Sequence, residues 1–381
     1  MGETTAPPMS SAPSSRAVVA PARVNLIGEH TDYSGGLVLP LAVDLGTTVT
    51  WRPVGGATIR LHSAAFDETI ELRTDAEAST SLEGWGRYVV AVLRLLLDHG
   101  MPPAGLDGEI VSTVPIGAGM SSSAALTVSV GLALARAASY ELERIELARI
   151  AQAAERLAVG VPVGLMDPAS SLFGRKGHAL LLDCATEEHR LVPLTPGIAL
   201  VVFDSGVRHE LERSDYGDRR LELERALAAI GTSRPSELDA AAAEEKAAAA
   251  GVDEVARRRL RHVVTENQRV REFVGVLEEP GGADLQMLGR LLREGHESLR
   301  DDFQVSIPEL DLLVDLAYEH GAIGARMIGG GFGGSVLALA QVDETSRLVD
   351  AVSRDYAERA GREATPYVCA SVDGAHEIDS A

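Results

Sequence analysis

Residues 114–126 read VPIGAGMSSSAAL, and this stretch runs from the end of a predicted strand, through a glycine turn, into a predicted helix. Glycines let backbone N–H groups approach an anion, and the unpaired amides at a helix N-terminus carry partial positive charge. The stretch therefore predicts a phosphate site built from main-chain amides. It lacks the lysine of GxxxxGK[ST], which excludes P-loop chemistry. The ordinary alternative is a strand–turn–helix in which one serine caps the helix.

The segments around this stretch predict a mixture of strands and helices. Strands are expected where β-branched or apolar runs lie between turn residues, at 37–39, 47–50, 58–61, 69–72, 108–114, 178–183 and 198–203. Helices are expected where apolar residues recur at helical spacing or the sequence is Ala-rich, at 86–98, 121–138 and 143–158.

The middle of the chain changes character. Residues 212–320 are charged, Ala-rich and helical in period, with breaks at Pro and Gly. Beyond them, strands are expected at 323–328, 335–340 and 366–371, and a helix at 343–359. Because strands flank this helical block on both sides, the sequence predicts an α+β fold whose C-terminal part folds back.

Composition narrows the class of protein. The 381 residues are 45% hydrophobic, enough for sizeable cores, and carry 35 Lys+Arg against 56 Asp+Glu, a net charge of −21. This charge repels nucleic-acid phosphates and anionic lipid head groups, so we expect neither nucleic-acid nor membrane partners. Cys184 and Cys369 form no CxxC motif, which fits a reducing cytoplasm. No leader or spanning segment is recognised, and residues 1–16 predict a disordered tail.

A second glycine cluster, GGGFGG at residues 329–334, formally contains GxGxxG. A dinucleotide-binding fold requires a helix after this motif. Residues 335–340 read as a strand instead, so we reject a nicotinamide site. The cluster predicts a turn between two strands, where a ligand or another part of the backbone comes very close.

Two further segments concentrate polar groups. Residues 23–36, RVNLIGEHTDYSGG, place four ionisable side chains in ten residues, which suits a polyhydroxylated ligand. Metal binding by His30 and Asp32 is a competing function, and a self-solvating polar loop is the ordinary alternative. In GLMDPAS, residues 164–170, an Asp directly precedes Pro. This pair is either a helix cap or a carboxylate held ready to accept a proton.

Three of these segments, in this order and at these separations, resemble the three motifs of the GHMP kinases and, among them, of the galactokinase family. They are RVNLIGEHTDYSGG, PIGAGMSSSAAL and GARMIGGGFGGS, at residues 23–36, 115–126 and 324–335. Similar stretches also occur at 178–184, 207–220, 261–270 and 298–311. The likeness extends from about residue 18 to the end of the chain.

The resemblance implies a two-lobed α+β fold, with mixed or antiparallel sheets in both lobes packed by helices and an active site between the lobes. Residues 17–200 would form the N-terminal lobe and 201–381 the C-terminal lobe. It also implies a cytoplasmic kinase that transfers phosphate from Mg-ATP to the anomeric hydroxyl of galactose, giving galactose 1-phosphate and ADP. We expect a monomer or a weak homo-oligomer.

The resemblance also assigns roles by position. Asp167 would act as the base, and Arg23 would orient it and stabilise the transferring phosphoryl group. Sugar contacts would come from Glu29, His30, Thr31, Asp32, Gly164 and Tyr216. The phosphates would lie on Gly117, Ala118, Gly119, Met120, Ser121, Ser122 and Ser123. Mg²⁺ would bind Ser123 and Glu155.

Four positions depart from the family pattern and leave sugar specificity open. Pro168 replaces a Gln and is expected to push Asp167 towards extended backbone; Ala22, Ser34 and Ile328 replace Gly, Asn and Thr. A related sugar 1-kinase acting on arabinose, N-acetylgalactosamine or galacturonate is one alternative. A non-catalytic regulator that binds galactose and ATP is another alternative. The presence of Arg23, Ser123, Glu155 and Asp167 argues against it.

Overall fold

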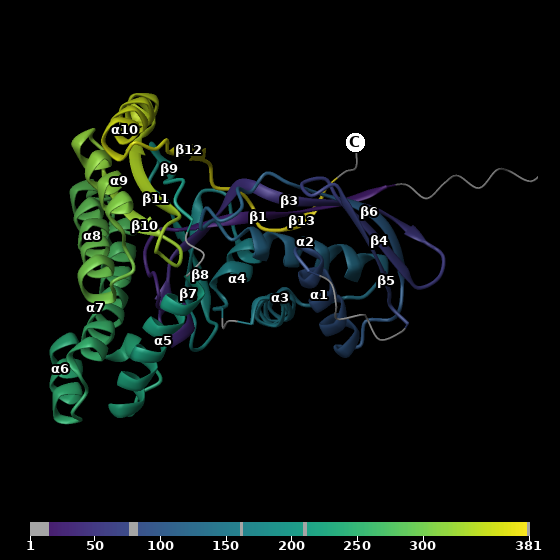
Figure 1. The fold of residues 1–381 in the computed structure, drawn as a ribbon, viewed down its shortest axis with the longest axis horizontal. Helices are drawn as coiled ribbons and strands as arrows, with labels where there is room; N and C mark the ends of the chain where they lie inside the picture. The colour runs from purple at the N-terminus through teal and green to yellow at the C-terminus, as the bar shows by residue number, and fades with distance from the viewer. Residues whose placement is uncertain (1–14, 76–82, 161–162, 209–211, 379–381) are drawn as a thin grey trace, which may run out of the picture.

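The computed structural model describes residues 15–75, 83–160, 163–208 and 212–378 (Figure 1). Its largest sheet has six strands in the order β13-β1-β3-β6-β4-β5, antiparallel except where β4 pairs with β6. These strands are β1 (Arg16–Asn25), β3 (Pro40–Val54), β4 (Thr58–Ser63), β5 (Glu68–Arg73), β6 (Gly105–Ser112) and β13 (His376–Ile378). Of the disordered tail expected at residues 1–16, residues 1–14 lie outside the described residues, and the prediction is wrong at Arg16, which begins β1 and pairs with Trp51 of β3.

One face of this sheet is covered by four helices, which lie together beneath it in Figure 1. They are α1 (Gly86–Asp98), α2 (Ser122–Ala137), α3 (Arg144–Val159) and α4 (Met166–Phe173). Helix α1 buries Val89, Val92, Leu93 and Leu96, the residues that its periodicity placed on one face. Beside these helices, a three-stranded sheet is formed by β2 (Leu37–Val38), β7 (His178–Asp183) and β8 (His189–Pro193).

A four-stranded antiparallel sheet forms the second half of the molecule, in the order β10-β11-β9-β12. Its strands are β9 (Ile198–Asp204), β10 (Gly324–Ile328), β11 (Ser335–Gln341) and β12 (Thr365–Cys369). Helices α7 (Glu254–Leu277), α8 (Leu285–Ser298), α9 (Pro308–Glu319) and α10 (Thr345–Ala360) lie beside it in Figure 1, and α5 (Glu212–Ala229) and α6 (Ala240–Ala249) pack against the lower end of α7. Short turns of helix complete the described chain at Asp32–Ser34, Pro235–Glu237, Leu299–Phe303 and Val342–Glu344.

Both faces of β9 are buried, which explains its continuous apolar run. Val201 and Phe203 pack into one core, with helices of the second half, whereas Leu200 and Val202 pack into another. Alternate residues of a strand point to opposite faces of the sheet. The second core also contains Val24 of β1, so the two halves of the molecule share buried apolar surface.

The sequence analysis located most elements but divided the chain differently. The boundary expected at residues 200 and 201 falls inside β9, and the last strand, β13, pairs with β1 in the first sheet. The short strands expected at 37–39 and 47–50 become β2 and the 15-residue β3. In the sequence, Gly46 reads as the interruption of a strand. In the structure, it lies inside β3, opposite Pro21 of β1, at the point where the pairing of the two strands shifts register. No described helix is both long and apolar enough to span a membrane.

Candidate active site

The predicted phosphate loop follows β6 and ends at the start of α2. Gly117 and Gly119 have φ of 76° and 68°, and Ser121 has φ of 60°, so three residues adopt left-handed backbone. The side chain of Ser121, the residue before the helix, makes no cap hydrogen bond. Its hydroxyl instead donates to Oδ2 of Asp167. A simple capping role therefore does not account for this serine.

Asp167 lies in the first turn of α4 and faces the phosphate loop. Nε of Arg23 donates to its Oδ1 at 2.7 Å, and Nη2 donates to its Oδ2 at 2.9 Å. The extended backbone expected at this residue is wrong, because Asp167 is helical. Pro168 is the third residue of α4, and an N–H in that turn has no partner within the helix. Asp167 therefore takes part in a side-chain cluster and is not a helix cap.

Arg23, near the end of β1, connects this carboxylate to the loop. Its Nη1 donates to the carbonyl oxygen of Gly119 at 2.6 Å, and the residue is buried. Burial opposes its charge, but the carboxylates of Asp167 and Glu29 outweigh burial and raise the pKa of Arg23. A permanent positive charge therefore lies between Asp167 and the loop.

A small cavity of about 150 Å³ opens beside Asp167. It brings together Asp167, Arg23 and five of the predicted sugar-binding residues: Glu29, His30, Asp32, Gly164 and Tyr216. Tyr33, Val163, Met166, Gly329 and Gly330 complete its lining. The predicted residue Thr31 is not part of it. The Thr31 hydroxyl lies 2.8 Å from the carbonyl oxygens of both Gly28 and Leu37, so it holds the loop's own backbone.

Burial favours the uncharged forms of two side chains in this cavity, His30 and Asp32. Burial lowers the pKa of His30 to about 3, so its imidazole is neutral. Its Nδ1 lies 2.9 Å from the hydroxyl of Tyr33, while its Nε2 is buried with no partner among the described residues. Burial, reinforced by the nearby Asp167 and Glu29, raises the pKa of Asp32 to about 7. Such groups both donate and accept hydrogen bonds, as a sugar requires.

Gly164 lies against Asp32 on the cavity wall. A Cβ atom at this position would lie 1.8 Å from Oδ2 of Asp32, which no structure tolerates. Glycine therefore allows Asp32 its present place, so the two residues predicted from separate segments depend on each other.

The glycine cluster at residues 329–334 joins β10 to β11, as expected. It brings two backbones very close, because a Cβ atom on Gly329 would lie 3.2 Å from Cα of Gly119 in the phosphate loop. The N–H of Gly329 also donates a hydrogen bond to Oε1 of Glu29 at 3.0 Å. Ser335 adds a hydrogen bond of 2.8 Å from its hydroxyl to the carbonyl oxygen of Ala118. The cluster thus holds the predicted phosphate loop close to the segment that carries Glu29.

Ser123 and Glu155, the predicted metal ligands, come from adjacent helices. The Ser123 hydroxyl donates to Oε2 of Glu155 at 2.9 Å. Burial, together with the charge of Asp167, raises the pKa of Glu155 to about 8. Its Oε1 is buried and has no partner among the described residues. A buried carboxylate oxygen without a hydrogen-bond donor is suited to a cation.

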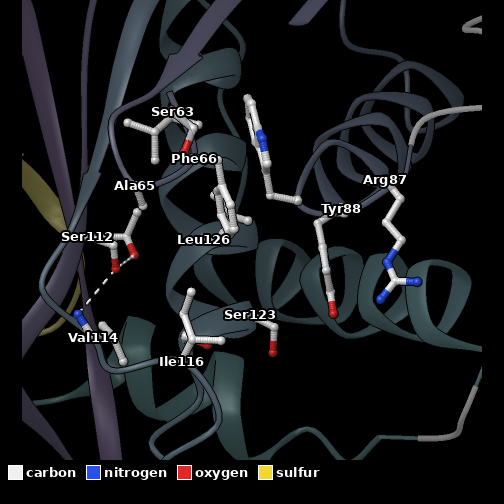
Figure 2. Close-up of a pocket in the computed structure, with 15 residues that line it drawn as sticks. Ser63, Ala65, Phe66, Arg87, Tyr88, Ser112, Val114, Ile116, Ser123 and Leu126 are labelled. Atoms are coloured by element: carbon white, nitrogen blue, oxygen red, sulfur yellow. Dashed lines mark hydrogen bonds between the residues drawn. The ribbon is translucent and has the colours of Figure 1, made fainter. Parts of the chain in front are cut away.

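A larger cavity of about 270 Å³ adjoins the phosphate loop and escaped the sequence analysis (Figure 2). Ser122, Ser123 and Ile116 lie at its loop end. Its walls carry aromatic side chains: Figure 2 shows Phe66 and Tyr88 projecting into the cavity, and Trp85 also lines it. Flat apolar walls next to a phosphate site suit the base of a nucleotide.

Comparison with known families and relatives agrees with this geometry. The galactokinase galactose-binding signature matches residues 9–53, and the models of the GHMP kinase N-terminal and C-terminal domains match residues 87–175 and 263–358. A galactokinase from Streptomyces coelicolor is 42% identical over 342 residues, which cover 89% of this chain and 88% of the relative. The chain belongs to the galactokinase family.

Other galactokinases are similarly close over nearly the whole chain. The galactokinase of Chloroflexus aggregans is 40% identical over 369 residues, covering 95% of this chain and 93% of the relative. The crystal structure of Lactococcus lactis galactokinase complexed with galactose superposes with a TM-score of 0.90 at 32% identity, covering 96% of this chain and 95% of that one. The two-lobed GHMP kinase architecture predicted from the sequence is thereby confirmed.

Proposed function

We propose that this chain transfers the terminal phosphoryl group of ATP to the anomeric hydroxyl of D-galactose, producing galactose 1-phosphate and ADP. Its membership of the galactokinase family supports this activity. The structural observation that carries the proposal is the position of Asp167. This carboxylate is hydrogen-bonded to Arg23 and to Ser121 of the phosphate loop, and it also lines the small polar cavity.

ATP would bind with its base in the aromatic cavity of Figure 2 and its phosphates on the phosphate loop. The loop offers main-chain amides and the N-terminus of α2, both of which favour negative charge. The residues concerned are Gly117, Ala118, Gly119, Met120, Ser121, Ser122 and Ser123. Because the cavity and the loop share Ser122 and Ser123, base and phosphates would be held in one continuous site.

The residues present fit a magnesium ion carried by ATP. Ser123 and Glu155 would hold it, and Oε1 of Glu155 offers a buried carboxylate oxygen with no other partner among the described residues. Magnesium is commonly bound by one or two protein side chains together with substrate phosphates. When bound, it neutralises charge that develops on the phosphate oxygens.

Galactose would occupy the cavity beside Asp167. Glu29, Asp32, His30 and Tyr216 would bind its hydroxyls, and Gly164 would leave Asp32 in place. We assign Thr31 to holding the loop instead, from its bonds to backbone carbonyls. A cavity that hydrogen-bonds many hydroxyls discriminates strongly against sugars that lack one of them.

The chemistry then follows from charge placement. Asp167 accepts the proton of the anomeric hydroxyl as the oxygen attacks the terminal phosphorus, and the bond to the ADP oxygen breaks. Arg23 keeps the carboxylate aimed and adds positive charge beside the loop, where negative charge spreads over the transferring group. Both residues are pre-positioned, so little rearrangement accompanies the reaction.

An ATP-consumption assay with a panel of sugars tests the proposal. We expect galactose to give the highest kcat/KM, well above arabinose, N-acetylgalactosamine and galacturonate. Preference for one of the other sugars would overturn galactose as the substrate but keep a sugar kinase. Galactose and ATP binding without turnover would instead show a regulator.

The surroundings in which the enzyme works are also a proposal. Cys184 and Cys369 are both free thiols, which suits a reducing cytoplasm. We propose a cytoplasmic enzyme that is a monomer or a weak homo-oligomer. Sedimentation of the purified chain over a range of concentrations tests the second statement.

A further inference from the structure

Helix α7 contacts the backbone of Gly28 and Glu29, in the segment that carries most of the predicted sugar-binding residues, without lining the cavity. Oε1 of Glu266 accepts hydrogen bonds from the N–H groups of Gly28 at 2.8 Å and Glu29 at 3.3 Å. Glu266 is fully buried and lies more than 230 residues along the chain from both donors. A carboxylate that accepts two backbone N–H bonds is a strong and specific anchor.

A second side chain of α7, one turn earlier, holds the same residue. Nε2 of His262 lies 3.1 Å from the carbonyl oxygen of Glu29, and its Nδ1 lies 2.9 Å from the Ser298 hydroxyl. Burial lowers the pKa of His262 to about 4, so the imidazole is neutral and donates through Nε2. Both the N–H and the carbonyl of Glu29 are therefore bound by α7.

The Glu29 side chain is held by charge. Arg326 of β10 is fully buried, with Nη2 at 3.4 Å from Oε1 of Glu29 and Nη1 at 3.8 Å from Oε1 of Glu266. The second carboxylate oxygen of Glu266, Oε2, accepts a hydrogen bond from Nε of Arg269 at 2.8 Å. Burial opposes ionisation of Glu266, but Arg269 and Arg326 outweigh it and lower its pKa to about 2. The four charges alternate in sign, and the buried cluster is neutral.

We propose that Glu266 is a positioning residue for galactose binding: it fixes the backbone of Glu29 and shares Arg326, which keeps the Glu29 carboxylate in the cavity. The inference rests on the proposed function. Glu266 does not line the cavity itself, so it acts only through Glu29. Helix α7 thereby belongs to the sugar site although it contributes no sugar contact.

Two substitutions separate the two parts of this role. Glu266→Gln keeps an oxygen that can accept from Gly28 and Glu29 but removes the charge. Arg269 and Arg326 then face only Glu29 among the four charges, and this uncompensated buried positive charge disturbs the placement of Arg326 and of the Glu29 carboxylate that it holds. Glu266→Asp keeps the charge but shortens the side chain, so the carboxylate no longer reaches both amides.

For each variant, the KM values for galactose and ATP are measured against the parent enzyme. We expect the galactose KM to rise about tenfold or more, because hydrogen bonds to a buried charged group are lost or redirected. The ATP KM should stay within about twofold. Val264→Ala, at another buried position of α7, is the matched control. It weakens the fold through the core but should leave both KM values unchanged.

The possible outcomes are distinct. If the parent enzyme does not phosphorylate galactose, the proposed function fails rather than this inference. If the parent does so and folded Glu266→Gln and Glu266→Asp both keep the parent galactose KM, the inference is overturned. A parallel rise in the KM for ATP, or failure of both variants to fold, would assign Glu266 to the general fold and would also overturn it.

Discussion

Arg23 and Asp167, which are 144 residues apart in the chain, meet through two parallel hydrogen bonds of 2.7 and 2.9 Å. A planar guanidinium matches both carboxylate oxygens at once and so fixes the plane of the carboxyl group. Since Arg23 also binds the Gly119 carbonyl, the orientation of Asp167 is tied to the phosphate loop. Asp167, the proposed base, and the predicted phosphate loop are therefore joined through one side chain.

Replacing Asp167, the proposed base, tests its role directly. We expect Asp167→Asn to lower kcat by at least ~10²- to 10⁴-fold, the usual contribution of a general base. The amide retains the size of the carboxyl group, so the variant should fold, which thermal unfolding checks. A kcat close to that of the parent enzyme would limit Asp167 to a structural role.

The proposed metal ligand gives a second prediction. Glu155→Gln should raise the magnesium concentration needed for half-maximal rate at fixed ATP, because a carboxylate ligand becomes a neutral amide. Glu143→Gln removes the same charge from an exposed position just before the same helix and serves as the control. Identical magnesium dependence in both variants would remove Glu155 from the metal site.

The contact between Gly164 and Asp32 predicts a steric effect on sugar binding. In Gly164→Ala the new methyl group would overlap Oδ2 of Asp32, which must move. We expect the galactose KM to rise at least about tenfold, as for other lost hydrogen bonds to charged groups, with little change in the ATP KM. Gly55→Ala, where a Cβ meets no atom within 4 Å, is the control. Equal galactose KM values for both variants would contradict this role.

Periodic elements and short motifs could be predicted from the sequence. The helix at 86–98 was located because its apolar residues recur at helical spacing. The strands near 323–328 and 335–340 were located because each is a short apolar run next to a glycine cluster. The motifs carrying Arg23 and Asp167 were recognised by resemblance. That these two side chains meet could not be read from spacing, because tertiary packing brings β1 and α4 together.

Residues of ordinary appearance escaped the sequence analysis. The cavity of Figure 2 is lined by Phe66, Trp85 and Tyr88, none of which belongs to a motif that the sequence analysis recognised. Likewise, residues 212–320 were recognised only as charged and helical in period, and nothing in that pattern indicated that Glu266 is fully buried. Its charge is tolerated because Arg269 and Arg326 neutralise it, and such partners become visible only in three dimensions.

The raised pKa of the Asp32 carboxyl group predicts that stability depends on pH. In the folded chain its pKa is about 7, against a usual value of 3.8, mainly because of burial. Between these values the folded state binds more protons than the unfolded state, so stability falls as pH rises. Asp32→Asn cannot titrate, and its unfolding free energy relative to the parent should increase from about pH 5 to about pH 8. Denaturant unfolding at both pH values measures this, and a constant difference would contradict the assignment.

Pro168 offers a final prediction, because it departs from the family pattern directly beside Asp167, the proposed base. It is the third residue of α4, where a backbone N–H would have no partner within the helix, so Pro costs no hydrogen bond there. Pro168→Gln should therefore keep Asp167 in place and leave kcat within a few-fold of the parent. The more flexible unfolded chain should lower stability by about 0.4–1 kcal/mol. Kinetics and denaturant unfolding check both statements. A large fall in kcat with stability unchanged would show that Pro168 helps to set the direction of the Asp167 carboxylate.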